Sequence, residues 1–269
     1  MNEAAKGVFR DLMLMLGLDG PYEQSFYVEE MEGRFGKEGG HYLDVCDALI
    51  NAGTLAAGSA PLYELMAANP DMARFIIAHS WSEIYRETGD ALIDSGLLEG
   101  REVVDFGCGF GLLTVCLANA TQSSRFCGLD VDAVIPAARR LVEGVDPGNV
   151  SLFESSRAAE VRVQDAVVMM NSVTHEIWDG ELSGAPVRGK VAPGRTELEL
   201  VRRWVGERGL LVTVNRLSNP KQQMPKLDTI FARAGLRPAQ TALREHVRLE
   251  GYAGLRRETL LLRVYAGAK

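Results

Sequence analysis

The ten residues EVVDFGCGFG, from Glu102 to Gly111, constrain the fold more than any other part of the sequence. Val103 and Val104 are β-branched and predict the end of a buried strand. Asp105 is followed by three glycines at alternate positions, which predict a tight turn where a ligand can approach the backbone closely. The next residues, GLLTVCLANA, are mostly apolar and contain no proline, so they predict a helix whose first N–H groups point at the turn.

A second acid follows at a spacing that suits the same site. The segment RFCGLDVD predicts a short strand that ends in Asp130, twenty-five residues after Asp105. In a βαβ unit this places Asp130 at the carboxyl end of the neighbouring strand, within reach of the ribose of a nucleotide ligand. A carboxylate there serves several nucleotide cofactors equally well, so this acid alone does not distinguish between them.

The spacing of the glycines does distinguish between cofactors. A dinucleotide-binding turn has the pattern GxGxxG, whereas here the third glycine comes one residue earlier and an acid precedes the first by two. The resulting DxGxGxG resembles motif I of the class I S-adenosylmethionine (SAM) methyltransferases. This resemblance implies that the turn holds the methionine end of SAM and that Asp105 orients its amino group. It also implies cofactor contacts from Gly107, Cys108, Gly109 and Val131, with a nicotinamide-dependent oxidoreductase as the alternative.

Composition and charge limit the partners and the compartment. The chain has 269 residues, of which 46% are hydrophobic and 24% charged, as in ordinary globular proteins. Its four cysteines form no CxxC pair and have no metal-ligand spacing with the histidines, so we expect no metal site and a reducing, cytoplasmic location. No run of apolar residues is long enough to span a membrane. The net charge of −7 argues against a nucleic-acid partner.

Residues 1–62 predict a helical N-terminal domain with helices near residues 3–16, 22–34 and 41–53. The first 60 residues hold ten acids and four bases, so a helix that reads DNA is not expected here. The segment YLDVCDALINAGTLAAG resembles the dimerisation module of small-molecule O-methyltransferases, which implies a homodimer through these helices. The alternative is a helical cap that packs against the chain's own catalytic domain.

Residues 63–100 predict connecting helices with a break at Pro70. Trp81 and Tyr85 are four residues apart and share a helix face. They stand where the resembled family has a helix that lines the cofactor and acceptor pocket, so both are predicted substrate contacts. The alternative is that the pair belongs to the core, which is the more common place for aromatic residues at this spacing.

Two further segments carry predicted site residues. NVSLFES predicts a third strand, at whose tip the resembled family would place an adenine contact, Glu154 or Ser155. DAVVMMNSVTHEIWD predicts a fourth strand followed by a segment that resembles the "LHdW" segment of the O-methyltransferases. By this resemblance Asn171 contacts the cofactor and His175 is the general base. Trp178 in the same segment is a predicted substrate contact.

An alternative role for His175 stays open. The acid that commonly ends the fifth strand and supports the catalytic histidine in the resembled family is here Asn215. Without that carboxylate, His175 can instead be a structural cap on the turn. The segment 180–195, rich in glycine and proline, predicts a flexible loop over the site.

The resemblance extends from residue 101 to the C-terminus. The last residues predict two strands, over 238–247 and 258–267, which match the antiparallel hairpin of a seven-stranded methyltransferase sheet. We therefore expect an α/β protein whose Rossmann-like catalytic domain, residues 101–269, follows an all-helical domain. The implied activity is SAM-dependent methyl transfer to a hydroxyl group of a small molecule. The alternatives are N- or C-methylation of a small molecule, or a SAM-binding protein of this fold that transfers no methyl group.

Overall fold

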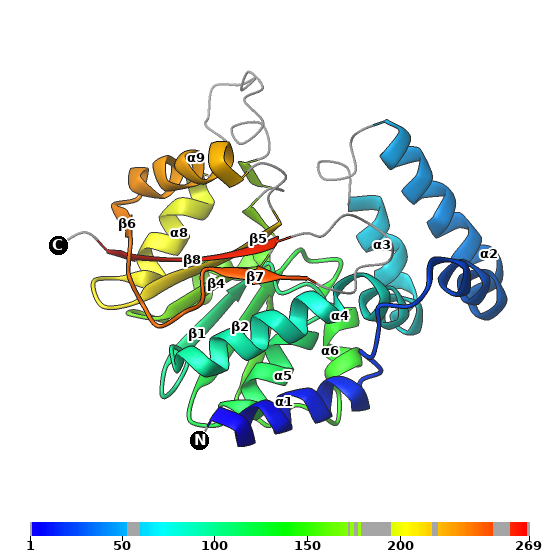
Figure 1. The fold of residues 1–269 in the computed structure, drawn as a ribbon, viewed down its shortest axis with the longest axis horizontal. Helices are drawn as coiled ribbons and strands as arrows, with labels where there is room; N and C mark the ends of the chain where they lie inside the picture. The colour runs from blue at the N-terminus through cyan, green and yellow to red at the C-terminus, as the bar shows by residue number, and fades with distance from the viewer. Residues whose placement is uncertain are drawn as a thin grey trace.

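The computed structural model describes residues 2–52, 60–171, 173–174, 177–178, 195–216, 220–249 and 259–267. Within these ranges a central β-sheet is covered by helices on both faces (Figure 1). Each strand of the sheet interior therefore buries both of its faces, which explains the nearly continuous apolar runs in the sequence.

The sheet follows the order β3-β2-β1-β4-β5-β8-β6, with β7 paired to β8 beside this path. Five strands are parallel to one another and precede an antiparallel C-terminal part. The parallel strands are β1 (Glu102–Phe106), β2 (Arg125–Asp130), β3 (Val150–Glu154), β4 (Val167–Asn171) and β5 (Leu210–Arg216). The antiparallel strands are β6 (Leu236–Pro238), β7 (His246–Arg248) and β8 (Thr259–Gly267). The seven-stranded path confirms the predicted fold class.

The C-terminal strands differ from the prediction in one respect. The single strand expected over 238–247 is two short strands, β6 and β7, and both pair with β8. β6 ends at Pro238, and the Ala239 N–H makes one more hydrogen bond, of 2.8 Å, to the Val264 carbonyl of β8. The chain then leaves β8 and returns at Glu245, whose carbonyl accepts a hydrogen bond of 2.8 Å from the Leu262 N–H, just before β7 begins. The described part of the sheet therefore has eight strands.

Two hydrophobic cores lie on opposite faces of the sheet. Val103 of β1 belongs to one core and Val104 to the other, because successive side chains of a strand point to opposite faces. The first core is covered by α4 (Pro70–Ser95), α5 (Leu112–Ala120) and α6 (Ile135–Val142). The second is covered by α8 (Arg195–Val205), α9 (Pro220–Arg233) and a 3-10 turn, η1 (Ser155–Glu160).

The N-terminal helices are α1 (Asn2–Met15), α2 (Gln24–Asn51) and α3 (Ala60–Ala68). The two helices predicted near 22–34 and 41–53 are one element, α2, which kinks at Gly36, where φ is 53°. The break at Pro70 is present as predicted, and the Asn69 side chain caps α4 by accepting a hydrogen bond of 3.1 Å from the Met72 N–H.

Helix α1 packs against α4 and α5 of its own chain. The Phe9 ring fills the space beside Gly89 of α4, where a Cβ atom would come within 2.1 Å of the ring. The first helix thus contributes to the core over the sheet, and the division of the chain at residues 62 and 100 stays a prediction. No helix in the described part of the chain combines the length and the apolar character needed to cross a membrane.

Candidate functional site

The glycine turn joins β1 to α5 at the carboxyl edge of the parallel strands. Gly107 has φ of 82° and Gly109 has φ of 57°, a region that side-chain-bearing residues rarely adopt. A Cβ atom on Gly107 would come within 2.8 Å of Val173, whereas a Cβ atom on Gly109 would meet no atom within 4 Å. The backbone at Gly109 is therefore open to a ligand, while the turn at Gly107 is packed from behind.

Asp130 lies beside this turn, at the end of β2. Its Oδ2 accepts a hydrogen bond of 2.6 Å from the Gly109 N–H, and its Oδ1 accepts one of 2.7 Å from the Val131 N–H. Burial raises the pKa of Asp130, and these two hydrogen bonds oppose the rise. The Val131 side chain is exposed at the strand tip.

Asp105 lies beneath the turn and is 1% exposed. Its Oδ2 accepts a hydrogen bond of 2.6 Å from the Thr114 hydroxyl of α5. Its Oδ1 is buried without a hydrogen-bond partner in the described structure. The pKa of Asp105 is raised to about 7, chiefly by burial and to a smaller extent by the nearby Asp130, while the Thr114 hydrogen bond opposes the rise. Asp105 is thus a buried acid with one oxygen still able to accept.

Tyr85 of α4 faces the same group of residues. It is buried, and its pKa is raised by burial and then by Asp105, Cys108 and Asp130. Half-buried Trp81 lies one helical turn away, with its ring centroid 6.3 Å from that of Tyr85. The structure therefore brings Tyr85 to the glycine turn, with Trp81 beside it.

Cys108 contributes backbone rather than a side chain to the turn. Its N–H donates a hydrogen bond of 3.0 Å to the Leu129 carbonyl. Its thiol is buried against β2, where a Cβ atom on Gly128 would come within 2.9 Å of the sulfur. Burial raises the pKa of this thiol well above its usual range, so it stays protonated.

Glu154 and Asn171 lie at the tips of the strands that flank β1 and β2. Glu154 pairs in register with Asp130 and is engaged by two arginines, with Arg139 at 2.8 Å and Arg157 at 3.6 Å. The Arg139 hydrogen bond lowers the pKa of Glu154. Asn171 ends β4 and is half-buried. Both residues share an edge of the sheet with the glycine turn, but the carboxylate of Glu154 is occupied by its arginines.

The segment after β4 divides into described and undescribed residues. His175, the predicted base, lies outside the described residues, as do residues 180–194 of the predicted loop. Thr174 lies next to His175 in the chain, and its hydroxyl is hydrogen-bonded to Oδ1 of the buried Asn215 at the tip of β5. The Asn215 side chain therefore ties β5 to the backbone that leads into His175.

Trp178 belongs to the hydrophobic core in this structure. It is 1% exposed and packs edge-on against Phe231 of α9, with ring centroids 5.5 Å apart. It lies in the core on the α8 and α9 face, whereas Asp105 and Tyr85 lie on the α4 face. The predicted substrate contact through Trp178 is not among the contacts that the structure brings together.

Sequence reasoning missed Thr114, the partner of Asp105. Its only signal is a hydroxyl in a mostly apolar helix, LLTVCLANA, nine residues after the acid. Within the described residues no group of three or more histidine, cysteine or acidic side chains is arranged to hold a metal ion.

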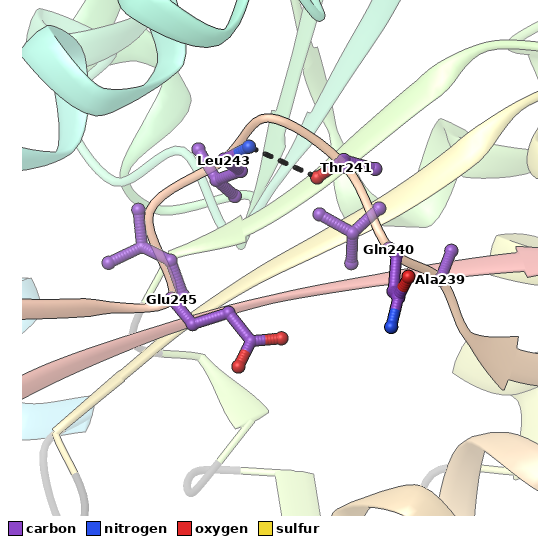
Figure 2. Close-up of a pocket in the computed structure, with 7 residues that line it drawn as sticks. Ala239, Gln240, Thr241, Leu243 and Glu245 are labelled. Carbon is purple, nitrogen blue, oxygen red and sulfur yellow. Dashed lines mark hydrogen bonds between the residues drawn. The ribbon is translucent and has the colours of Figure 1, made fainter.

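A pocket of about 240 Å³ lies elsewhere, between the β6–β7 loop and β8 (Figure 2). It is lined by Ala239, Gln240, Thr241, Leu243, Glu245, Leu262 and Val264. It is smaller than the roughly 300 Å³ at which pockets for small molecules begin. In the sheet order β8 is three strands from β1, on the order of 14 Å at the usual strand spacing. This pocket is therefore separate from the glycine turn.

Comparison with solved structures identifies the class of fold. No protein-family model and no curated protein matches the chain. The pyocyanin biosynthetic protein PhzM has a TM-score of 0.56 and 19% identity, over 89% of this chain and 72% of that one. The mitomycin 7-O-methyltransferase MmcR has a TM-score of 0.51 and 14% identity, over 86% and 69%. A SAM-dependent methyltransferase from Aquifex aeolicus has a TM-score of 0.51 and 16% identity, over 73% and 98%. The chain has the fold of the SAM-dependent methyltransferases.

Proposed function

We propose that this protein binds SAM at the glycine turn and transfers its methyl group to a hydroxyl group of a small molecule. The observation that carries the proposal is a pair of acids, the buried Asp105 and the half-buried Asp130, beside a backbone that is open at Gly109. In a fold shared with SAM-dependent methyltransferases, this is the edge of the sheet where ligands bind.

The residues at the turn fit SAM chemically. The unpaired Oδ1 of Asp105 suits an ammonium group, which can donate hydrogen bonds to it. Each oxygen of Asp130 already accepts one hydrogen bond from the backbone, and a carboxylate has further lone pairs with which to accept from ribose hydroxyls. SAM supplies a reactive sulfonium methyl group, so the protein's own residues serve mainly to align the acceptor and exclude water.

In this proposal His175 takes the proton of the acceptor hydroxyl, because an imidazole with an ordinary pKa near 6.5 is matched to this task at neutral pH. Tyr85 and Trp81 contact the acceptor from α4. Small molecules with amine acceptors form the second candidate class, since an amine needs no base and the β5 tip carries Asn215 instead of a carboxylate.

A matched pair of glycine variants tests the cofactor site. Gly109 and Gly148 both have positive φ and both have room for a Cβ atom, but Gly148 lies in the loop after α6, outside the proposed site. Calorimetry with SAM should show lost binding in Gly109→Ala and retained binding in Gly148→Ala, although both variants carry similar backbone strain. Equal binding in the two variants would remove the turn from the cofactor site.

Mass spectrometry of the protein as isolated is the complementary test. We expect copurified SAM or S-adenosylhomocysteine, and release of S-adenosylhomocysteine when hydroxylated small molecules are added with SAM. Binding of SAM without such release from any acceptor would leave a SAM-binding protein of this fold that transfers no methyl group.

The proposal includes a homodimer formed through residues 1–60 in a reducing, cytoplasmic compartment. Apolar side chains at the ends of the first two helices are exposed, including Leu14, Met15 and Ile50, and all four cysteines are free. Sedimentation at micromolar concentration should give a dimer. A monomer would contradict the proposed dimer, and the role of α1 would then be limited to its packing on α4 and α5 of the same chain.

A further inference from the structure

Two carboxyl groups, the buried Asp105 and the half-buried Asp130, interact at the glycine turn without a cation between them in the described structure. Asp105 is in β1 and Asp130 ends the adjacent strand β2. The other groups that interact with Asp105 are the Thr114 hydroxyl of α5, the Tyr85 hydroxyl of α4 and the thiols of Cys108 and Cys127. None of these groups carries a positive charge, so two ionised carboxylates here would repel each other in a region of low dielectric constant.

The hydrogen bonds decide which of the two acids carries a proton. Both oxygens of Asp130 accept from backbone N–H groups, which stabilise its ionised form. Asp105 accepts only from Thr114, and its Oδ1 has no partner in the described structure. Asp105 is also the more deeply surrounded of the two, at 1% exposure. A proton shared between these acids therefore resides on Asp105.

We propose that Asp105 holds a proton in the free protein and releases it when the ammonium group of SAM binds, so that cofactor binding is coupled to the loss of one proton. This inference rests on the proposed function, since it requires SAM at the glycine turn. The O–H bond of the Asp105 carboxyl group breaks, its electron pair stays on the carboxylate, and the proton goes to solvent. The ammonium group of the cofactor keeps its own protons and replaces the lost positive charge at Oδ1.

The coupling sets the direction of the pH dependence. Burial and Asp130 raise the pKa of Asp105 to about 7 in the free protein, and a bound ammonium group lowers it again. Above pH 7 the Asp105 carboxylate is already ionised and adds no further pH dependence. SAM affinity should therefore be highest between pH 7 and the pKa of the SAM α-amino group, about 7.7 to 8.0, above which that group must take up a proton to bind. Below pH 7 a proton must leave on binding, so affinity should fall by up to about tenfold for each pH unit.

Calorimetry in buffers of different ionisation enthalpy counts the protons that binding releases. With SAM we expect release of about one proton at pH 6. At pH 8 we expect no release but uptake of a fraction of a proton, because the α-amino group of free SAM, with an ordinary pKa of about 7.7 to 8.0, must be protonated to bind as ammonium. S-adenosylhomocysteine keeps the ammonium group, so it should release the same number. 5′-Methylthioadenosine has the nucleoside and the sulfur but no amino acid part, so it should release none.

The outcomes separate the two proposals. SAM binding with no proton release at pH 6 would overturn the coupling and leave the proposed function intact. Proton release with 5′-methylthioadenosine would also overturn it, because the ribose and Asp130 would then be responsible. Failure of SAM to bind at either pH would overturn the proposed function and this inference together.

Two variants extend the test beyond the wild-type protein. Asp105→Asn cannot titrate, so it should bind SAM more weakly at pH 8 and release no proton at pH 6. Asp228→Asn is the matched control, because Asp228 accepts from Arg263 and Tyr265 on the far side of the sheet order. It should release the same number of protons as the wild-type protein. If Asp105→Asn fails to fold, the proton counts of the wild-type protein with the three ligands still decide the question.

Discussion

The buried Asp105 and the half-buried Asp228 are two acids with opposite hydrogen-bonding states. Asp228 of α9 accepts 2.9 Å hydrogen bonds on both oxygens, from the Tyr265 hydroxyl and the Arg263 guanidinium of β8. Asp105 accepts one hydrogen bond and keeps a buried oxygen without a partner in the described structure. Buried polar groups in folded proteins are nearly always hydrogen-bonded. The satisfied acid therefore stabilises the fold, whereas the unsatisfied acid is available to a ligand.

The two halves of the sheet differ in the same way: the parallel half offers polar groups to a ligand, and the antiparallel half uses its polar groups within the fold. The parallel strands β1, β2, β3 and β4 bring their carboxyl ends to one edge, where Asp130 contacts the glycine turn and Glu154 and Asn171 end the flanking strands. The antiparallel strand β8 runs in the opposite direction and joins β5, β6 and β7 through backbone hydrogen bonds. Variants at the parallel edge should therefore change ligand binding and turnover, and variants in the antiparallel half should change stability.

The largest effect that this contrast predicts is on turnover. His175→Ala should lower methyl transfer by roughly 10² to 10⁴, the usual contribution of a general base, with unchanged SAM affinity and melting temperature. His246→Ala is the control, because His246 is an exposed residue of β7 in the antiparallel half. Turnover that persists within a few-fold in His175→Ala, measured as release of S-adenosylhomocysteine, would make His175 a structural residue.

The next largest effect is on stability, and it has an unusual sign. The pKa of Asp105 is about 7 in the folded protein and 3.8 as its ordinary value, so the folded protein binds more protons between these values. Its contribution to stability therefore falls as the pH rises from about 4 to about 7. Asp105→Asn should raise the free energy of unfolding at pH 8, by at most about 4 kcal/mol.

Denaturant unfolding at several pH values measures this effect. The difference between Asp105→Asn and the wild-type protein should vanish near pH 4 and be complete at pH 8. Destabilisation at pH 8 would mean that the Asp105 carboxylate contributes to the fold as Asp228 does, and the contrast between the two acids would fail.

The sequence predicted the glycine turn and Asp130 correctly in position because both depend on local order along the chain. A strand, a glycine turn and a helix are fixed by neighbouring residues, and a right-handed crossover brings the next strand alongside. The structure adds the side-chain contacts between segments that are separate in the sequence. Glu154 is bound by the long side chain of Arg139, which comes from the preceding helix, and Trp178 is buried against Phe231 of the distant helix α9. Neither contact leaves a periodic pattern in the sequence, so neither could be predicted from it.

The separate short strands β6 and β7 could not be predicted from the local sequence either. β6 and β7 each have three residues, too few for an alternating pattern to be recognised. Their positions depend on pairing with β8, which was predicted because its nine residues are almost all apolar or β-branched. Thr114 could have been predicted only as an unexplained hydroxyl in a mostly apolar helix.

A smaller effect is expected at the second acid of the parallel edge. Asp130→Ala should weaken SAM binding by on the order of 1 to 3 kcal/mol, because the ribose hydroxyls lose a charged acceptor and the Gly109 and Val131 N–H groups lose theirs. Calorimetry at pH 8 measures this loss of SAM affinity under conditions where Asp105 is already ionised and releases no proton on binding. Unchanged affinity would remove the ribose from this edge of the sheet.

The smallest effect belongs to the satisfied acid. Asp228→Asn removes the charge of an ion pair whose side chains are 25% and 30% exposed, but it keeps an oxygen that can accept from Arg263 or Tyr265. Because the pair is partly solvated and only its charge is lost, the free energy of unfolding should fall by about 1 kcal/mol or less. SAM affinity and turnover should stay at wild-type values, since α9 and β8 contribute nothing to the glycine turn. A loss of SAM affinity in this variant, with little change in unfolding, would show that the antiparallel half also serves the ligand.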